Sequence, residues 1–228
     1  MAYAYFAFLD VMGYRYYLKK DKNDGTELFK TKLISSYRVF ENIEIATLHH
    51  KSISDSIFMS SANDAYNFLC ATKQVFLSFL ENGLFVRGGI AYNKHFETNH
   101  ITYSLALTDA YNIESEQSIF PRILIDKAVI QKLQNEAEPP QNNQTLQQII
   151  ENKLLINCGS HYQLHILDDT NWDNTFEKAR DMYTTYQADI DESPKLTAYH
   201  SWFQEYLFNF KPARNRKLRY IKQFELTD

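Results

Sequence analysis

The chain has 228 residues, of which 44% are hydrophobic and 23% charged, and these proportions are typical of a folded globular protein. Its formal net charge of −4 argues against a protein built mainly to hold nucleic acid. The sequence has no apolar run near the roughly 18 residues of a membrane helix, and no basic leader precedes its first strand, so we expect a cytoplasmic protein.

The first predicted element is a strand from Tyr3 to Val11, in which one carboxylate, Asp10, ends an apolar run. Aromatic and aliphatic residues of this kind are typical of a buried strand. A carboxylate at such a strand end lies where open α/β sheets usually place their chemistry, and Gly13 lets the backbone come close to a ligand. Turns are also rich in aspartate and glycine, so an ordinary turn is the alternative.

Helical and extended patterns then follow each other along the chain. We expect a helix start over 13–20, a polar loop over 19–25, and a helix that Thr26 caps. Residues 43–60 predict two strands joined by a tight turn at 54–56. The later expected elements are a helix over about 62–82, strands over 84–92 and 101–103, a helix over 105–117, strands over 122–126 and 161–167, helices over 175–190 and 195–209, and a last strand over 219–224.

The chain shows no internal repeat and no clear boundary, so we expect a single domain over residues 1–228. Residues 134–148 are rich in Gln, Asn and Pro, and this composition predicts a surface excursion from that domain.

Two aspartates far apart in the sequence are predicted to meet at one edge of the sheet. Asp10 ends the first strand, and Asp55 lies at the tip of the hairpin that follows the next long helix. Two nearby carboxylates repel each other unless cations lie between them. Mg²⁺ is commonly held by one or two carboxylates together with substrate phosphates, and a pair of such ions can promote an in-line displacement at phosphorus.

The sequence contains Phe-Ala-Phe-Leu-Asp-Val-Met-Gly-Tyr at 6–14, Ser-Asp-Ser-Ile-Phe at 54–58 and Leu-Phe-Val-Arg-Gly-Gly-Ile-Ala at 84–91. In this order, the three segments resemble the class III nucleotidyl cyclase catalytic domain. Two further segments, Ala-Leu-Thr-Asp-Ala-Tyr-Asn-Ile-Glu at 106–114 and Pro-Arg-Ile-Leu-Ile-Asp at 121–126, are similar to the pyrimidine cyclases of bacterial Pycsar anti-phage defence. The resemblance covers residues 3–126 and returns weakly in the basic segment near the C-terminus. We therefore expect an α/β fold with a mostly antiparallel sheet, helices packed chiefly on one face, and a βααββαβ core.

The resemblance also implies a site. Asp10, Asp55 and the backbone carbonyl of Val11 would bind two Mn²⁺ or Mg²⁺ ions. The backbone amides at the start of the first helix would cradle the triphosphate, and they belong to Val11, Met12, Gly13 and Tyr14.

Base choice in the wider family depends partly on the residue four positions before the second metal aspartate. That residue is Lys51, which alternation along a strand places on the same face as Asp55, and His49 is a second candidate for the base pocket. Adenylyl cyclases often have lysine there too, so Lys51 does not exclude ATP. The preference for UTP, with CTP second, rests on the resemblance over 106–126.

The sequence departs from the family at one place. Many class III cyclases carry Asn and Arg four residues apart on the helix after the short strand, where these side chains orient the ribose and stabilise charge at phosphorus. Thr108 and Asn112 occupy these positions here. Another cation must substitute, or the site is slow or inactive. The candidate cations are Arg87, Arg122, Lys211, Arg214 and Arg216, and we take Arg87 and Arg214 as triphosphate contacts.

Arg87 and the basic run that contains Arg214 can also have a purely structural role, without any contact to a ligand. Arg87 lies in an apolar strand and is costly there unless it has a partner, which a protein carboxylate supplies as well as a phosphate does. The basic run over 211–222, which includes Arg214, is the kind of segment that commonly forms a solvated face.

We therefore expect a nucleotide cyclase that converts UTP, or alternatively CTP, to the 3′,5′-cyclic nucleotide and pyrophosphate as a second messenger in anti-phage defence. The resemblance implies a homodimer with shared active sites and a separate effector that senses the cyclic nucleotide. Two alternatives stay open. One is a catalytically silent nucleotide-binding or scaffold domain of the same fold, which Thr108 and Asn112 motivate. The other is a purine (ATP or GTP) cyclase or another two-metal phosphotransferase.

Overall fold

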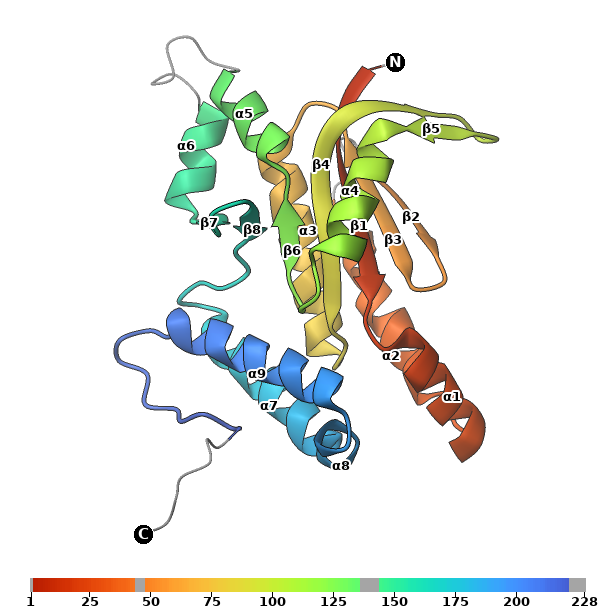
Figure 1. Ribbon diagram of the computed structural model, residues 1–228, viewed down its shortest axis with the longest axis vertical. Coiled ribbons are helices and arrows are strands. Elements are labelled where there is room, and N and C mark those ends of the chain that lie inside the picture. Colours follow the sequence, from red (N-terminus) through yellow and green to blue (C-terminus); the bar gives the residue numbers. More distant parts are fainter. Residues whose placement is uncertain (1, 44–47, 136–143, 222–228) are drawn as a thin grey trace. The chain divides into compact units, whose positions relative to one another are not determined.

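A computed structural model describes residues 2–43, 48–135 and 144–221 of the chain (Figure 1). The described residues form two compact units, Met1–Ile166 and Leu167–Asp228, which we describe separately. The single domain expected over residues 1–228 stays a prediction.

The first unit is built on an eight-stranded sheet. Its described strands are β1 (Ala2–Val11), β2 (His49–Ile53), β3 (Ser56–Ser61), β4 (Val86–Glu97), β5 (Thr102–Ser104), β6 (Ile123–Ile125), β7 (Leu155–Asn157) and β8 (Tyr162–Leu164). They pair in the order β2-β3-β1-β4-β6-β8-β7, and β5 pairs with β4 outside this path. Every pairing is antiparallel except that of β4 with β6. The predicted mostly antiparallel sheet is confirmed.

Helices connect these strands in the predicted order. The described helices of the unit are α1 (Tyr14–Asp24), α2 (Leu28–Tyr37), the 3-10 helix η1 (Arg38–Glu41), α3 (Ala65–Glu81), α4 (Leu105–Glu116), α5 (Lys127–Asn135) and α6 (Gln144–Glu151). The order β1-α1-α2-β2-β3-α3-β4 reproduces the expected βααββαβ core.

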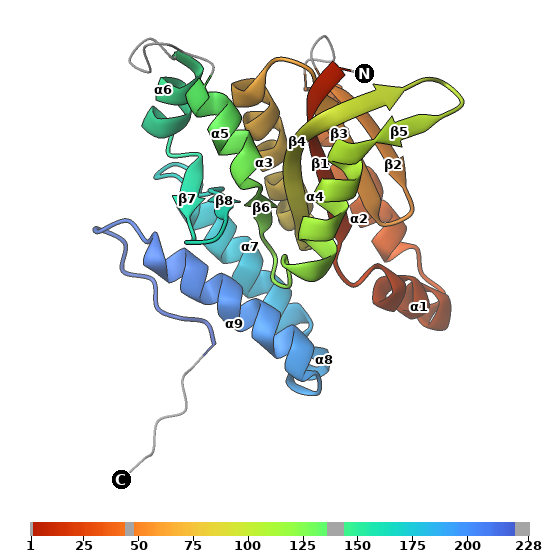
Figure 2. The same cartoon turned by 45° about the horizontal axis from the view of Figure 1, so that its top comes forward.

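Strand β1 is buried on both faces because α3 and α4 cover opposite sides of the sheet (Figure 2). On one face the ring of Tyr5 packs against Phe68 of α3, with ring centroids 6.1 Å apart. On the other face Phe6 and Phe8 share an apolar cluster with Ala110 of α4. Alternate residues of β1 thus point to different helices, as the pleat of a strand requires.

Gly89 in β4 allows α4 to lie very close to the sheet. A Cβ atom at this position would meet the carbonyl oxygen of Ala110 and would lie 2.8 Å from Cβ of Ile113. Any side chain larger than hydrogen would therefore push α4 away from β4.

The start of the chain differs from the sequence prediction. The polar residues 19–24 form the end of α1 instead of a loop, and Gly25 ends this helix with a φ of 64°. No residue of α1 is buried, so this helix shows no apolar stripe that the sequence could reveal. Thr26 does not cap α2, whose N-cap is Glu27, because the Thr26 hydroxyl donates to the Asp21 carboxylate at 2.8 Å.

Further corrections concern the later elements. Helices α5 and α6 and strand β7 are absent from the predicted elements, and the strands expected over 122–126 and 161–167 shorten to β6 and β8. Part of the surface excursion expected over 134–148 is helical, since 144–148 belong to α6, and 136–143 lie outside the described residues. Residues 44–47 of the predicted hairpin also lie outside them.

The second unit is helical. Its described helices are α7 (Trp172–Thr185), α8 (Gln187–Asp191) and α9 (Pro194–Asn209), so the single helix expected over 175–190 is interrupted at Tyr186. The strand expected over 219–224 is wrong for residues 219–221, and its other residues are not described. The Ile221 backbone instead bonds to the Gln204 side chain, with its N–H donating at 2.7 Å and its carbonyl accepting at 3.3 Å.

Among the helices in the described ranges, none combines the length and the apolar character needed to cross a lipid bilayer.

Gly89→Ala should destabilise the first unit, because the new methyl group overlaps the backbone of α4. We expect a loss of about 2 kcal/mol or more in the free energy of unfolding, the range of an overpacked core. Thermal unfolding of wild type and variant measures the loss. An unchanged midpoint would show that α4 does not pack against β4 in this way.

His200 should make the second unit sensitive to acid. The side chain is buried, and burial lowers its pKa to about 4 from the ordinary 6.5. Between these values the unfolded chain takes up a proton that the folded chain refuses, so stability falls as the pH drops from 6.5 towards 4. A shift of this size corresponds to roughly 3 kcal/mol when it is fully expressed.

Urea unfolding followed by tryptophan fluorescence tests this effect, because both tryptophans, Trp172 and Trp202, lie in the second unit. The stability of wild type should fall between pH 7 and pH 4.5, and His200→Gln should lose much less over the same interval. If wild type and His200→Gln lose stability equally over this interval, His200 is not the cause of the acid sensitivity.

Candidate active site

The backbone brings Asp10 and Asp55 to the same end of the sheet. Asp10 pairs with Ser56 across the β1–β3 ladder, and Asp55 forms the turn between β2 and β3 together with Ser54, which has a φ of 59°. The N–H of Val11 donates to the carbonyl oxygen of Asp55 at 2.8 Å. The turn predicted at 54–56 thus places its aspartate beside the end of β1.

Arg87 of β4 lies between two carboxylates at this end of the sheet. It is directly opposite Asp10 in the β1–β4 ladder, and its Nε donates to the Asp10 carboxylate at 3.3 Å. Its Nη2 forms an ion pair of 2.7 Å with Glu114 of α4, whose side chain is only 4% exposed. One guanidinium group therefore joins the strand end, the neighbouring strand and the helix above them.

Glu114 adds a third acidic group to the site. Burial raises the pKa of Glu114 to about 7, against the effect of Arg87, and the nearby charges of Asp10 and Asp55 raise it further. Arg87 thus pairs with two carboxyl groups, Asp10 and Glu114, and the charge of Asp55 acts on Glu114 as well. A divalent cation would neutralise this gathering of acidic groups. Glu114 is not among the predicted site residues, although an arginine in an apolar strand, such as Arg87, needs a carboxylate partner of this kind.

The donor set fits Mn²⁺ or Mg²⁺, which prefer carboxylate, carbonyl and water ligands. Within the described residues no group of three or more His, Cys, Asp or Glu side chains is arranged to hold a metal ion. Asp10 and Asp55 would therefore supply the carboxylates, and the remaining ligands would be a backbone carbonyl, water and phosphate.

The backbone amides expected to cradle the triphosphate differ in whether a carbonyl already accepts from them. Gly13, with a φ of 79°, turns the chain from β1 into α1, and Tyr14 is the first residue of that helix. The first N–H groups of a helix have no helical acceptor, so these two amides suit an anion. The Met12 N–H instead donates to the carbonyl of Phe85 at 2.9 Å, and that of Val11 is used by Asp55. The Val11 and Met12 amides therefore already have acceptors, and a triphosphate contact stays a prediction for the amides of Gly13 and Tyr14.

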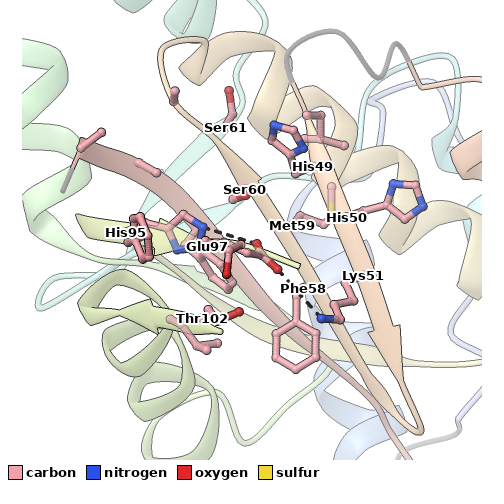
Figure 3. A pocket seen from close by; sticks show the side chains of 18 of the residues that line it. His49, His50, Lys51, Phe58, Met59, Ser60, Ser61, His95, Glu97 and Thr102 are labelled. Atoms are coloured by element: carbon pink, nitrogen blue, oxygen red, sulfur yellow. Dashed lines mark ion pairs between the residues drawn. The ribbon is translucent and has the colours of Figure 1, made fainter. Parts of the chain in front are cut away.

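Lys51 and His49 line a pocket of about 1040 Å³ (Figure 3). Alternation along the paired strands places Lys51 on the face of the sheet that carries Asp10. Lys51 is opposite Phe58 of β3, which in turn is opposite Phe8, two residues before Asp10. The prediction that Lys51 shares a strand face with Asp55 needs correction, because β2 ends at Ile53 and Asp55 belongs to the turn. Neither Asp10 nor Asp55 lines this pocket.

Comparison with solved structures relates this architecture to known proteins. Adenylate cyclases from Trypanosoma brucei, in their monomeric state, superpose with a TM-score of 0.54 and 12% sequence identity, over 74% of this chain and 92% of theirs. A bacterial light-regulated adenylyl cyclase gives a TM-score of 0.48 and 11% identity, over 79% of this chain and 98% of its own. Models of known families and the sequences of curated proteins give no match.

The chain has the nucleotide cyclase fold. The likeness extends to the mostly antiparallel sheet and its helices, as the sequence resemblance predicts.

The positions that depart from the cyclase pattern lie on α4. Thr108 and Asn112 are both exposed, and spacing of four residues places them on one face of the helix. The Thr108 hydroxyl donates to the carbonyl of Ser104 at 3.1 Å. Neither side chain carries a positive charge, so neither supplies the arginine that the sequence resemblance implies at that point.

The other candidate cations differ in their surroundings. Arg122 is partly buried, and its Nη2 donates to the carbonyl of Gln117 at 3.2 Å, which indicates a structural role. Within the second unit, Lys217 pairs with Glu177 at 2.6 Å, and Arg219 forms two bonds to Glu205 at 3.0 and 2.6 Å.

Lys211 bonds to a carbonyl of its own segment. Arg214 and Arg216 are exposed and have no charged partner in the part of the chain that the structure describes. The triphosphate contact expected for Arg214 stays a prediction, since this residue lies in the second unit.

Arg87→Met should destabilise the first unit, because it leaves Glu114 buried without its cation. Removing one partner of a buried pair typically costs about 3–5 kcal/mol, whereas replacing both by apolar groups is often neutral. The double variant Arg87→Met/Glu114→Leu should therefore recover most of the loss. Thermal unfolding measured by circular dichroism compares the three proteins. A double variant no more stable than Arg87→Met would rule out a dominant role for this pair.

Proposed function

We propose that this chain is a nucleotide cyclase that converts a pyrimidine nucleoside triphosphate, UTP in preference to CTP, to the 3′,5′-cyclic nucleotide and pyrophosphate. The observation that carries the proposal is the meeting of Asp10 and Asp55 at one end of the sheet, beside the Arg87 guanidinium, in a cyclase fold. The resemblance to class III cyclases implies that such a pair of aspartates binds two Mn²⁺ or Mg²⁺ ions.

Bound ions would supply the activation of the ribose 3′-hydroxyl and the neutralisation of charge at phosphorus. Asp10 and Asp55 would hold them, and the amides of Gly13 and Tyr14 would donate to phosphate oxygens. Arg87 is kept in place by Glu114, so its guanidinium can turn one edge to a phosphate group once Asp10 binds a cation. Much of the rate enhancement would then come from positioning and charge compensation.

A homodimer with shared active sites fits the distribution of these residues. The metal-binding aspartates do not line the pocket that holds Lys51 and His49, so one nucleotide contacts both groups most simply across two chains. Large apolar side chains are exposed around β5 and α4, namely Ile101, Tyr103 and Tyr111. Exposed apolar groups gathered in one region favour contact with a partner protein.

The pyrimidine preference, the role as a second-messenger source in anti-phage defence, the separate effector and the cytoplasmic location all rest on the sequence resemblance. A purine cyclase is the second candidate, which the lysine at position 51 and the adenylate cyclase neighbour favour. A silent nucleotide-binding domain is the third, because Thr108 and Asn112 carry no charge.

Incubation of the purified chain with each of the four nucleoside triphosphates and Mn²⁺, followed by mass spectrometry, tests the proposal. We expect cyclic UMP as the main product. Asp10→Asn and Asp55→Asn should each lower the rate by about 100-fold or more, since loss of even an outer partner of a metal site costs about 10- to 100-fold. Asp181→Asn, at an exposed aspartate of α7, is the matched control and should keep full activity.

Each other outcome has a definite meaning. Cyclic AMP or cyclic GMP as the main product would establish the purine cyclase. If no nucleotide gives a product, the third candidate, a silent nucleotide-binding domain, is the one that remains. Full activity of either aspartate variant would contradict the assigned metal site.

A further inference from the structure

Helix α1 carries a stripe of basic residues that the function described above does not use. Arg15, Lys19 and Lys22 follow one another at spacings of four and three residues, so they lie on one face of the helix. All three are exposed, and Leu18, which is 47% exposed, lies on the same face. We call these four residues the basic stripe. In the described part of the chain its three cations form no ion pair.

The other face of α1 packs on α2 and so fixes the direction of the stripe. The ring of Tyr17 stacks on Phe29 of α2 with centroids 5.2 Å apart, and Tyr14 meets the same ring edge-on at 5.2 Å. The Asp21 carboxylate accepts from the Thr26 hydroxyl at 2.8 Å and from the Phe29 N–H at 3.0 Å. Helical spacing places the cations of the stripe on the side away from these contacts.

Helix α2 adds more exposed apolar and basic side chains to this part of the molecule. Leu28 and Ile34 are 67% and 53% exposed, and Lys30 is exposed as well. The segment 14–38 holds seven Lys and Arg against three Asp and Glu, although the whole chain has a net charge of −4. Figures 1 and 2 show α1 and α2 projecting beside the end of β1, away from β5. Positive charge and exposed aliphatic groups therefore gather on one projecting helix pair.

We propose that α1 and α2 dock the protein on a membrane surface rich in anionic phospholipid. The cations of the basic stripe contact the lipid phosphates, and Leu18 enters the boundary of the acyl chains. A basic helix that also exposes aliphatic groups binds bilayers in this way. Each Lys or Arg near an anionic leaflet adds to the attraction, and several together are needed for stable binding.

The side chains around the stripe favour lipid over nucleic acid. A nucleic-acid surface combines cations with aromatic rings that are open to stack on bases. The rings of α1 are already engaged, since Tyr14 and Tyr17 pack on Phe29 and Tyr16 meets Tyr17 edge-on. Leu18 gains nothing from a phosphate backbone, but it leaves water when it enters the acyl boundary. The projecting helix pair also suits the flat surface of a bilayer (Figure 1).

This surface is independent of the cyclase site and of the proposed homodimer contact. The apolar groups assigned to that contact lie on β5 and α4, so both surfaces can be occupied together. Lys19, Lys22 and Leu18 have no part in the proposed chemistry. Their substitution should leave cyclase activity in solution unchanged, so the inference and the proposed function can fail separately.

Sedimentation of the full chain with lipid vesicles tests the inference. Vesicles of phosphatidylcholine alone are compared with vesicles of phosphatidylcholine and phosphatidylglycerol in equal parts. Wild type should bind the anionic vesicles about tenfold more tightly or better, and rising salt should weaken this binding. Lys19→Glu/Lys22→Glu should lower the affinity for anionic vesicles by about 100-fold or more, because two attractive charges become repulsive.

Leu18→Ser separates insertion from adsorption by charge alone. It should lower the affinity for anionic vesicles by about tenfold and keep the salt dependence, since it removes buried apolar area and no charge. No residue of α1 is buried, so these variants should keep the fold, which circular dichroism checks. Lys127→Glu/Lys195→Glu is the matched control: both lysines are exposed in the first turn of a helix, and the net charge changes equally. The control should lose much less affinity.

Four results would each overturn the inference. They are equal binding of wild type to both kinds of vesicle, an equal loss in the control and in Lys19→Glu/Lys22→Glu, and an unchanged affinity in Leu18→Ser. The fourth is a single-stranded oligonucleotide that displaces wild type from the vesicles and whose own binding is lost in Lys19→Glu/Lys22→Glu. That result would assign the basic stripe to nucleic acid.

Discussion

The ion pairs of Arg87 hold the candidate site together. A guanidinium group three-quarters buried between an apolar strand and a helix is stable only when carboxylates face it, and Asp10 and Glu114 do so. This requirement fixes β1, β4 and α4 relative to one another at the end where the chemistry is proposed. Gly89 makes it possible, since only the absence of a side chain there lets α4 approach β4 closely enough for Glu114 to reach Arg87.

The same contacts leave the site with more negative than positive charge. Asp10 and Glu114 both pair with Arg87, and the high pKa of Glu114 is the result of burial together with the nearby charges of Asp10 and Asp55. Such an arrangement is unfavourable in the free protein and becomes favourable when cations bind. Both the fold and the electrostatics therefore favour the binding of cations at this end of the sheet.

Much of the fold could be predicted because its signals are local. The apolar strand before Asp10, the turn at 54–56 and the order of elements up to β4 all follow from periodicity and turn chemistry. The sequence did not reveal that Glu114 completes the Arg87 pair, or that the Met12 amide is already bonded to Phe85, because both depend on contacts between distant segments. Helix α1 was missed over 19–24 for a different reason: an exposed helix carries no apolar stripe.

One feature of β1 bears on the energetics of ligand binding. The peptide groups of Val11 and Met12 tie the strand end to two different loops, one before β3 and one before β4. The backbone that carries the acidic pair is thus immobilised when the protein folds, before any ligand arrives. Little conformational entropy is then left to lose on association, so the affinity for a charged ligand reflects the interactions themselves rather than the cost of ordering a loose segment.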